Sequence, residues 1–156
     1  MSEIYDTPPT LNTGFTIGGQ DFDTDACTRA IGIEPSQVWR QTRADLIDDP
    51  RLANVQWTIE LRGRELFSTD DAVREVINIV WPKRREIAAF VEANNLECSV
   101  TCNITIHGDQ PVYEVSVETM SKLVELNAEL GFDIFDFSEC DDEAEDQAPS
   151  QPGSGG

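Results

Sequence analysis

The stretch LECSVTCNITI, residues 96–106, alternates apolar and polar side chains without interruption. Successive side chains of a β-strand point to opposite faces, so this spacing places all of the apolar side chains on one face. The stretch therefore predicts a half-buried strand in a sheet with one apolar face and one polar face. The apolar positions are Leu96, Cys98, Val100, Cys102, Ile104 and Ile106.

The segments on either side of this strand carry further strand and helix signals. Residues 55–61 alternate in the same way, and apolar patterns predict further strands over 11–17, 112–115 and 132–137. Helical spacing of apolar residues predicts helices over 25–31, 70–81 and 117–131. Pro82 either kinks the second of these or opens another helix that ends near Asn94. In the helix over 117–131 we expect Gly131 as the stop and a buried face of Met120, Leu123, Val124 and Leu130.

This order of elements predicts an α+β fold. We expect a single mixed β-sheet of four to five strands with helices packed mainly on one face, as a two-layer sandwich. A chain of 156 residues is long enough to bury its own core. We expect a flexible N-terminal arm over residues 1–10, one domain over 11–138, and a disordered tail over 139–156 that is acidic and rich in Gly, Ser and Pro.

The cysteines and the apolar runs bear on the compartment. Cys27, Cys98, Cys102 and Cys140 lack the CxxC spacing of zinc sites, and His107 is the one histidine. We therefore expect buried, reduced thiols and no metal or cofactor. No stretch approaches the roughly 20 apolar residues of a membrane span, and the start of the chain lacks the features of a signal peptide. These observations predict a cytoplasmic protein.

The charge is strongly negative and unevenly distributed. The formal net charge is −19; residues 1–85 carry 14 acidic and 10 basic residues, whereas residues 86–156 carry 16 acidic residues and the single base Lys122. A field of this sign disfavours nucleic acid and anionic membrane as partners and steers a cationic partner towards the C-terminal half. The alternative interpretation is that the acidity serves solubility alone.

Residues 31–40, IGIEPSQVWR, place Trp39 beside Arg40 just after the first predicted helix. Our first interpretation is that Trp39 packs inward as a lid where helix and sheet meet, while Arg40 pairs with a surface acid. The alternative is a site for a small anion around Trp39, because Trp and Arg side chains suit such a ligand. Its arginines converge if the loop over 41–53 folds over the strand at 55–61; they are Arg40, Arg43, Arg62 and Arg64.

The sequence contains no recognisable catalytic set. Gly18 and Gly19 lie between a predicted strand and a predicted helix, but the spacing of phosphate-binding loops is absent. Asp21, Asp23 and Asp25 do not match a calcium loop and suit a helix N-terminus instead. No GxSxG motif is present. We therefore name no catalytic, cofactor-binding or metal-binding residue, and a binding function is favoured over an enzymatic one.

Glycine, proline and tryptophan positions along the chain carry a family resemblance. Phe15-Thr-Ile17-Gly-Gly19 precedes Ile31-Gly32-Ile33-Glu-Pro35 and Trp39-Arg40; Trp57 follows in a strand, and a Ser-X-Glu helix leads into Phe132-Asp-Ile134. Over about residues 15–137 this pattern resembles a family of small bacterial domains of unknown function. That family commonly has a glycine shortly after the Trp-Arg pair, where this chain has residues 41–45, QTRAD. The resemblance implies a shared fold and brings no established reaction.

These observations favour a non-enzymatic acidic binding protein. Our leading hypothesis is an immunity or inhibitor protein that neutralises a basic protein partner such as a toxin, with Glu125, Glu129, Asp133 and Asp136 as candidate contacts. A second hypothesis is a small-anion sensor or an enzyme that uses the region of Trp39 and Arg40. A third is a domain that self-associates as a homo-oligomer through an exposed sheet edge or face.

Overall fold

The computed structural model describes residues 7–49 and 52–138, and in this part of the chain five strands form one mixed sheet in the order β2-β3-β1-β4-β5. β1 (Thr10–Gly19) lies in the centre and pairs antiparallel with β3 (Val55–Glu65) and β4 (Glu97–Ile106). At the edges, β2 (Gln37–Arg40) is antiparallel to β3 and β5 (Ala128–Asp136) is parallel to β4.

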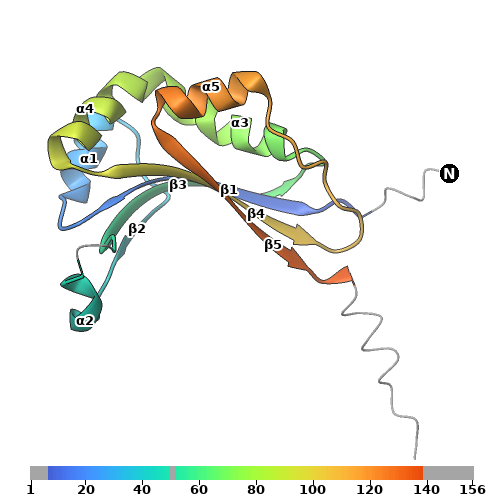
Figure 1. Cartoon of the computed structure of the whole chain (residues 1–156), viewed down its shortest axis with the longest axis horizontal. Coiled ribbons are helices and arrows are strands. Elements are labelled where there is room, and N and C mark those ends of the chain that lie inside the picture. Colours follow the sequence, from blue (N-terminus) through green and yellow to red (C-terminus); the bar gives the residue numbers. More distant parts are fainter. Residues whose placement is uncertain (1–6, 50–51, 139–156) are drawn as a thin grey trace, which may run out of the picture.

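The longer helices cover one face of this sheet, as Figure 1 shows. They are α1 (Thr24–Ile31), α3 (Thr69–Val80), α4 (Arg84–Asn94) and α5 (Val117–Glu125). The 3-10 turn η2 (Trp81–Lys83) contains Pro82 and separates α3 from α4, so this proline lies between two helices. The short α2 (Ala44–Ile47) lies beyond β2, away from the helical layer (Figure 1). The predicted α+β fold with helices mainly on one face is confirmed.

The core lies between the helices and the sheet because the alternating pattern of the strands directs one row of side chains towards the helices. In β1, the side chains of Leu11, Phe15 and Ile17 are fully buried, and Trp57 of β3 is fully buried beside them. From the helices, α3 contributes the largest set of buried apolar residues: Ala72, Val73, Val76, Ile77 and Val80.

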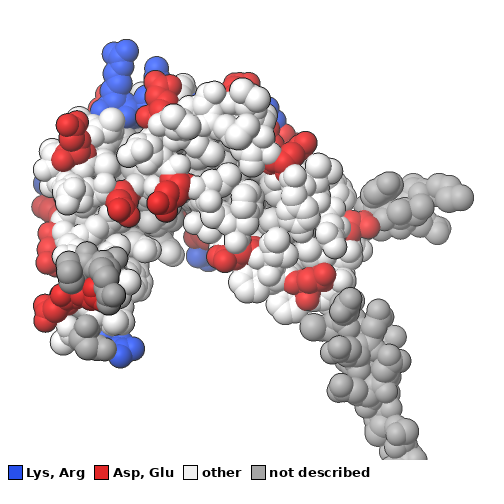
Figure 2. Space-filling model, viewed as in Figure 1, with Lys and Arg blue, Asp and Glu red and all other residues white. Residues whose placement is uncertain are grey.

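The opposite face of the sheet is lined by small polar side chains. The hydroxyl groups of Thr16 and Thr58 lie 3.0 Å apart and share a hydrogen bond across β1 and β3. Ser99, Thr101 and Asn103 continue this polar face along β4. Figure 2 shows that the molecule is hollowed on this helix-free side. The one-sided pattern of the strands predicted this polar face.

Two sequence predictions are wrong and concern neighbouring elements. The predicted strand over 112–115 does not form; Val112 makes only an isolated bridge to Ser68. The predicted helix over 117–131 ends at Glu125, because Asn127 adopts a left-handed conformation with φ of 51° and turns the chain into β5. Leu130 and Gly131 therefore lie in β5, and Met120 and Val124 are exposed rather than buried.

The chain ends beyond this domain are outside the described residues. β1 begins at Thr10, and just before it the carbonyl of Thr7 accepts a hydrogen bond from the N–H of Asp109 at 3.0 Å. Residues 1–6 of the predicted arm, the whole predicted tail over 139–156 and Cys140 lie outside the described part of the chain. Among the described residues, none of the helices has the length and apolar character needed to cross a membrane.

A hydrogen bond between α1 and β3 generates a first prediction. The indole N–H of the buried Trp57 donates to the hydroxyl oxygen of Thr28 at 2.9 Å. Replacing Thr28 with Val keeps the shape of the side chain but leaves this N–H unsatisfied, which costs about 1–3 kcal/mol. Chemical denaturation is expected to show this loss for Thr28→Val and a much smaller loss for Thr28→Ser. Equal stability of the Val variant and the wild type would contradict the assigned role.

Asp70 at the start of α3 generates a second prediction. Burial raises the pKa of this carboxyl group, but the N–H of Ser116, the hydroxyls of Thr119 and Ser116, and the charge of Arg74 lower it, and the net pKa is lowered. The backbone N–H of Ser116 donates to Asp70 Oδ1 at 2.8 Å, which ties the start of α5 to α3.

A lowered folded-state pKa stabilises the protein above the unfolded-state value of about 3.9, and this stabilisation is lost as the pH falls through the folded-state pKa. Asp70→Asn removes this contribution. The difference in unfolding free energy between wild type and variant is therefore expected to be about 1–2 kcal/mol at pH 7 and to shrink towards pH 3. A difference that stays constant over this range would show that the charge of Asp70 does not contribute.

Candidate functional site

β5 is an edge strand whose outer side pairs with no other strand of the described chain. It is joined to α5 by the turn at Leu126 and Asn127 and runs parallel to β4 from Ala128 to Asp136 without a shift in register. Figure 1 shows β5 at the outside of the sheet, extending beyond the helical layer. An open edge of this length presents unpaired backbone groups to a partner.

Large apolar side chains are exposed on both faces of β5. Phe132 and Ile134 share the helix-side face with Cys102 and Ile104, their partners in β4, whereas Phe135 points to the helix-free face. Exposed apolar residues that gather in this way are typical of an interaction surface rather than of a solvated edge. The exposed fractions are 41% for Phe132, 52% for Ile134, 52% for Phe135 and 48% for Phe137.

The helix that precedes β5 adds to this exposed surface. α5 buries Thr119 and Leu123 and leaves its other apolar side chains exposed. The segment before α5 also approaches β5, since burial and the nearby charge of Asp136 raise the pKa of Tyr113. We call the combined area the β5–α5 surface and define it by nine exposed residues: Val112, Tyr113, Val117, Met120, Val124, Phe132, Ile134, Phe135 and Phe137.

All four acids predicted as candidate contacts lie on or beside this surface. Glu125 ends α5, and its Oε1 lies 3.6 Å from Arg84 Nε. Glu129 and Asp133 lie on the helix-free face of β5, where they pair with Ser99 and Asn103 of β4. Asp136 ends the strand; hydrogen bonds from the hydroxyl and the N–H of Ser138 lower its pKa. The acids therefore lie along the length of β5, from Glu125 just before the strand to Asp136 at its end, among exposed apolar residues.

Little positive charge offsets these acids. Between residues 112 and 138, Lys122 is the only Lys or Arg in the sequence. Its Nζ lies 3.6 Å from Oε1 of Glu118 and 5.1 Å from the ring centre of Trp81, so it packs against α5 and η2. The β5–α5 surface is accordingly negative in net charge, and acidic side chains are visible along this part of the molecule in Figure 2.

Trp39 and Arg40 point to opposite faces of edge strand β2. Trp39 pairs with Gln56 on the helix-free face and is 40% exposed, so the prediction that it packs inward as a lid is wrong. A four-residue edge strand paired on one side buries little of a residue that points away from the helices. Arg40 lies on the helix side, where its Nη2 donates to the hydroxyl of Thr24 at 3.1 Å. The pKa of the nearby Asp23 is lowered chiefly by a hydrogen bond from the N–H of Ala26, and the charge of Arg40 contributes to this lowering.

The structure does not bring Trp39, Arg40 and Arg43 together into one anion site. Because Trp39 and Arg40 lie on opposite faces of β2, one small ligand cannot contact both side chains from the same face. Arg43 is an exposed residue at the N-terminus of α2, beyond the end of the strand.

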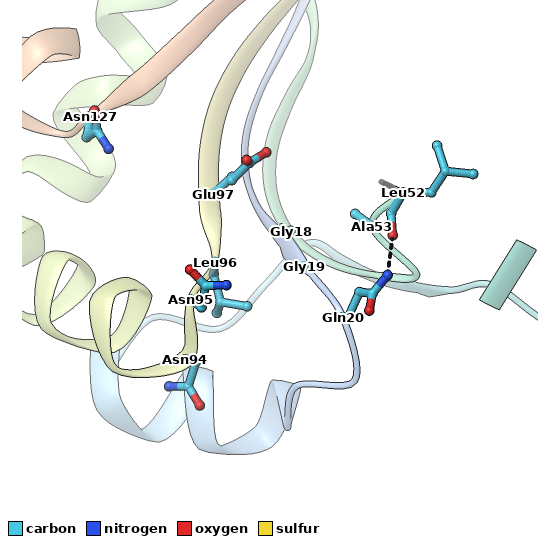
Figure 3. Close-up of a pocket in the computed structure, with 10 residues that line it drawn as sticks. All are labelled: Gly18, Gly19, Gln20, Leu52, Ala53, Asn94, Asn95, Leu96, Glu97 and Asn127. Carbon is cyan, nitrogen blue, oxygen red and sulfur yellow. Dashed lines mark hydrogen bonds between the residues drawn. The ribbon is translucent and has the colours of Figure 1, made fainter. Parts of the chain in front are cut away.

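A cleft of about 600 Å³ opens at one end of the sheet, where β1 ends and β4 begins (Figure 3). Two of its amide groups are already engaged. Gln20 Nε2 donates to the carbonyl oxygens of Asp49 at 2.7 Å and Leu52 at 3.2 Å, and Asn94 Nδ2 donates to that of Phe90 at 2.9 Å. None of the seven predicted site residues lines this cleft. Its lining residues are Gly18, Gly19, Gln20, Leu52, Ala53, Asn94, Asn95, Leu96, Glu97 and Asn127.

The three described cysteines are buried free thiols, as predicted. Burial raises the pKa of Cys27 to about 12, that of Cys98 to about 12 and that of Cys102 to about 11. A thiol with such a pKa is a poor nucleophile near neutral pH because the thiolate is the reactive form. Within residues 7–49 and 52–138, no three His, Cys, Asp or Glu side chains gather closely enough to hold a metal ion.

Sequence reasoning found the acids of the surface but missed its apolar part. The spacing of Met120 and Val124 fits one helix face and predicts that they are buried, yet only Leu123 of the predicted face within α5 is buried. The sequence from Phe132 to Phe137 does contain a signal for exposed apolar residues. Its apolar residues fall on both faces of a strand, which at a sheet edge places some of them outside the core.

A known family of domains matches the part of the chain that forms the sheet and its helices. A family model described as a domain of unknown function (DUF4279) matches residues 9–137, which include all five strands and the helices between them. Comparison with curated proteins and with solved structures found no match. The resemblance to a family of domains of unknown function is confirmed, and the chain belongs to the DUF4279 family.

Proposed function

We propose that this protein is a non-enzymatic binding protein of the immunity or inhibitor type, which neutralises a basic protein partner such as a toxin. The observation that carries this proposal is the composition of the β5–α5 surface. It combines exposed aromatic and aliphatic side chains with four acids on or beside one edge strand whose outer side is open in the described chain. Apolar anchors within a polar rim are the usual anatomy of a protein–protein interface.

The apolar part of this surface supplies the binding energy in the proposal. A few buried aromatic residues near the centre of an interface typically carry most of its affinity. Phe132 and Phe135 project from opposite faces of β5, so a partner that covers the strand edge contacts both. Dehydration of such side chains stabilises a complex by roughly 25 cal/mol per Å² of apolar area removed from water.

The acids define the sign of the partner and the rate of association. With a net charge of −19, the protein attracts a cationic partner over distances near the Debye length and repels polyanions. Complementary charge raises association rates, and this gain falls as salt is added. The cytoplasm is the compartment we propose, because buried free thiols suit a reducing environment.

The anion-sensor hypothesis has weaker support than the binding hypothesis. It required Trp39 and Arg40 to act together, and their side chains lie on opposite faces of β2. Trp39 nevertheless provides a matched control for the β5–α5 surface, because its exposed fraction of 40% is close to the 41% of Phe132 and it lies at the opposite edge of the sheet.

Three versions of the chain test the proposal: wild type, Phe132→Ala and Trp39→Ala. The wild-type chain is used to recover a basic partner from the native cells, and the affinity of the purified partner for each version is then measured by calorimetry. We expect Phe132→Ala to weaken binding at least about tenfold, which corresponds to ~1.4 kcal/mol. We expect Trp39→Ala to bind within about twofold of wild type, because it lies outside the proposed surface.

Salt provides the second arm of this experiment. A tenfold increase in salt is expected to lower the affinity of the wild-type chain by slowing association. Unchanged affinity would contradict the electrostatic part of the proposal. A loss of binding confined to Trp39→Ala would move the site to β2 and contradict the assignment to β5.

A further inference from the structure

The outer edge of β5 presents a regular row of backbone hydrogen-bonding groups. The N–H of Phe137 donates to the carbonyl of Ile106 in β4 at 2.9 Å, which continues the ladder past the end of the strand. Backbone groups of successive strand residues point alternately to the two sides, and the β4–β5 register has no shift. The groups of Asp133 and Phe135 therefore face β4, and those of Phe132 and Ile134 face outwards.

The side chains along this edge follow the same alternation. Phe132 and Ile134, whose backbone groups face outwards, carry apolar side chains on the helix side of the sheet. Asp136 follows them on the same side at the end of the strand. On the helix-free side, Glu129 and Asp133 carry carboxylates, and the aromatic ring of Phe135 follows them. The helix side of the edge is thus mainly apolar, and the helix-free side carries two acids together with the exposed Phe135.

We infer that the basic partner binds by adding an extended strand antiparallel to β5. Its apolar side chains lie next to Phe132 and Ile134, and its Lys or Arg side chains lie next to Glu129 and Asp133. This inference rests on the proposed function and specifies how the surface is used. In strand addition, backbone hydrogen bonds supply affinity and alternate side chains supply specificity. Antiparallel pairing is chosen because it is slightly more stable per residue than parallel pairing.

The charge of the edge argues against a second copy of this chain as the occupant. β5 itself carries three acids, Glu129, Asp133 and Asp136, and no Lys or Arg. Pairing two β5 strands would bring these like charges together, whereas a basic strand relieves their repulsion. Residues 128–136, AELGFDIFD, also contain no Pro or Lys of the kind that blocks edge pairing.

Antiparallel geometry determines which partner amides face β5. Residues directly opposite one another in a hydrogen-bonded pair exchange both of their backbone bonds. The partner residues opposite Phe132 and Ile134 are the apolar ones, so their N–H groups point to β5. The N–H groups of the basic residues point away from it. Methylation of one or the other set of amides therefore has different consequences.

The probe is a nine-residue peptide of alternating lysine and valine, blocked at both ends. Two further versions carry N-methyl groups on the inner valines or on the inner lysines, with identical composition and charge. Fluorescence anisotropy with the full chain is expected to show binding of the parent peptide and of the lysine-methylated peptide. The valine-methylated peptide is expected to bind at least about tenfold more weakly. Equal binding of the two methylated peptides, the reverse order, or no binding of the parent would overturn the inference.

Two substitutions at one position of β5 provide the matched protein variants. Ile134→Ala shortens the side chain and keeps the outward N–H, whereas Ile134→Pro also removes that N–H. A proline at this edge position disturbs no hydrogen bond to β4, so both variants are expected to unfold at similar temperatures. Ile134→Pro is expected to bind the parent peptide at least about fivefold more weakly than Ile134→Ala. Indistinguishable affinities of two folded variants would contradict strand addition.

The outcomes separate this inference from the proposed function. If the basic protein from native cells depends on Phe132 but Ile134→Pro binds it as well as Ile134→Ala does, the proposed function stands and strand addition is wrong. Measuring the molecular mass of the free protein over a range of concentrations tests whether a second copy of this chain occupies the edge instead. Dimerisation of the free chain that Ile134→Pro abolishes would assign the edge to a second copy and overturn the inference.

Discussion

The packing of the helices on the sheet depends on the burial of one face of the central strand β1. Leu11, Phe15 and Ile17 are fully buried because β3 and β4 flank the strand on both sides and the helices cover its apolar face. Cooperative burial of this kind is the main favourable contribution to folding. The two edge strands, β2 and β5, lie outside this central burial, and most of their residues are exposed.

As an edge strand, β5 exposes residues that the core does not need. α5 provides the crossover that a parallel strand requires, and β5 then extends along β4 past the region that the helices cover. An exposed apolar edge favours unwanted pairing between copies, and the acids beside it oppose such pairing through like-charge repulsion. The same acids attract a basic strand, so protection of the edge and selection of a partner have one physical origin.

Much of the fold could be predicted from the sequence, and the errors fall where local signals compete with tertiary structure. The strand over 96–106 and the buried side of α3 follow from period alone, because each meets a continuous apolar layer. Gly131 was assigned as a helix stop, but the left-handed residue after α5 is Asn127, and Gly131 lies inside β5.

The candidate site was predictable only in its charge. The acids Glu125, Glu129 and Asp133 follow one another closely in the sequence, which indicates an acidic segment whatever its conformation. Exposure of Phe132 and Phe135 depends on β5 being an edge strand, and strand order is a property of the whole chain. Trp39 illustrates the same limit, since its face is determined by the pairing of β2 with β3.

The exchange rates of individual backbone amides in β5 test the central claim most directly. Hydrogen–deuterium exchange followed by NMR compares the free protein with its complex with the basic partner. In the free protein, the amides of Phe132 and Ile134 are expected to exchange faster than those of Asp133 and Phe135, and partner binding is expected to slow Phe132 and Ile134 selectively. Amides of Phe132 and Ile134 that are already protected in the free protein, or that are unaffected by the partner, would contradict the assignment of β5 as the binding edge.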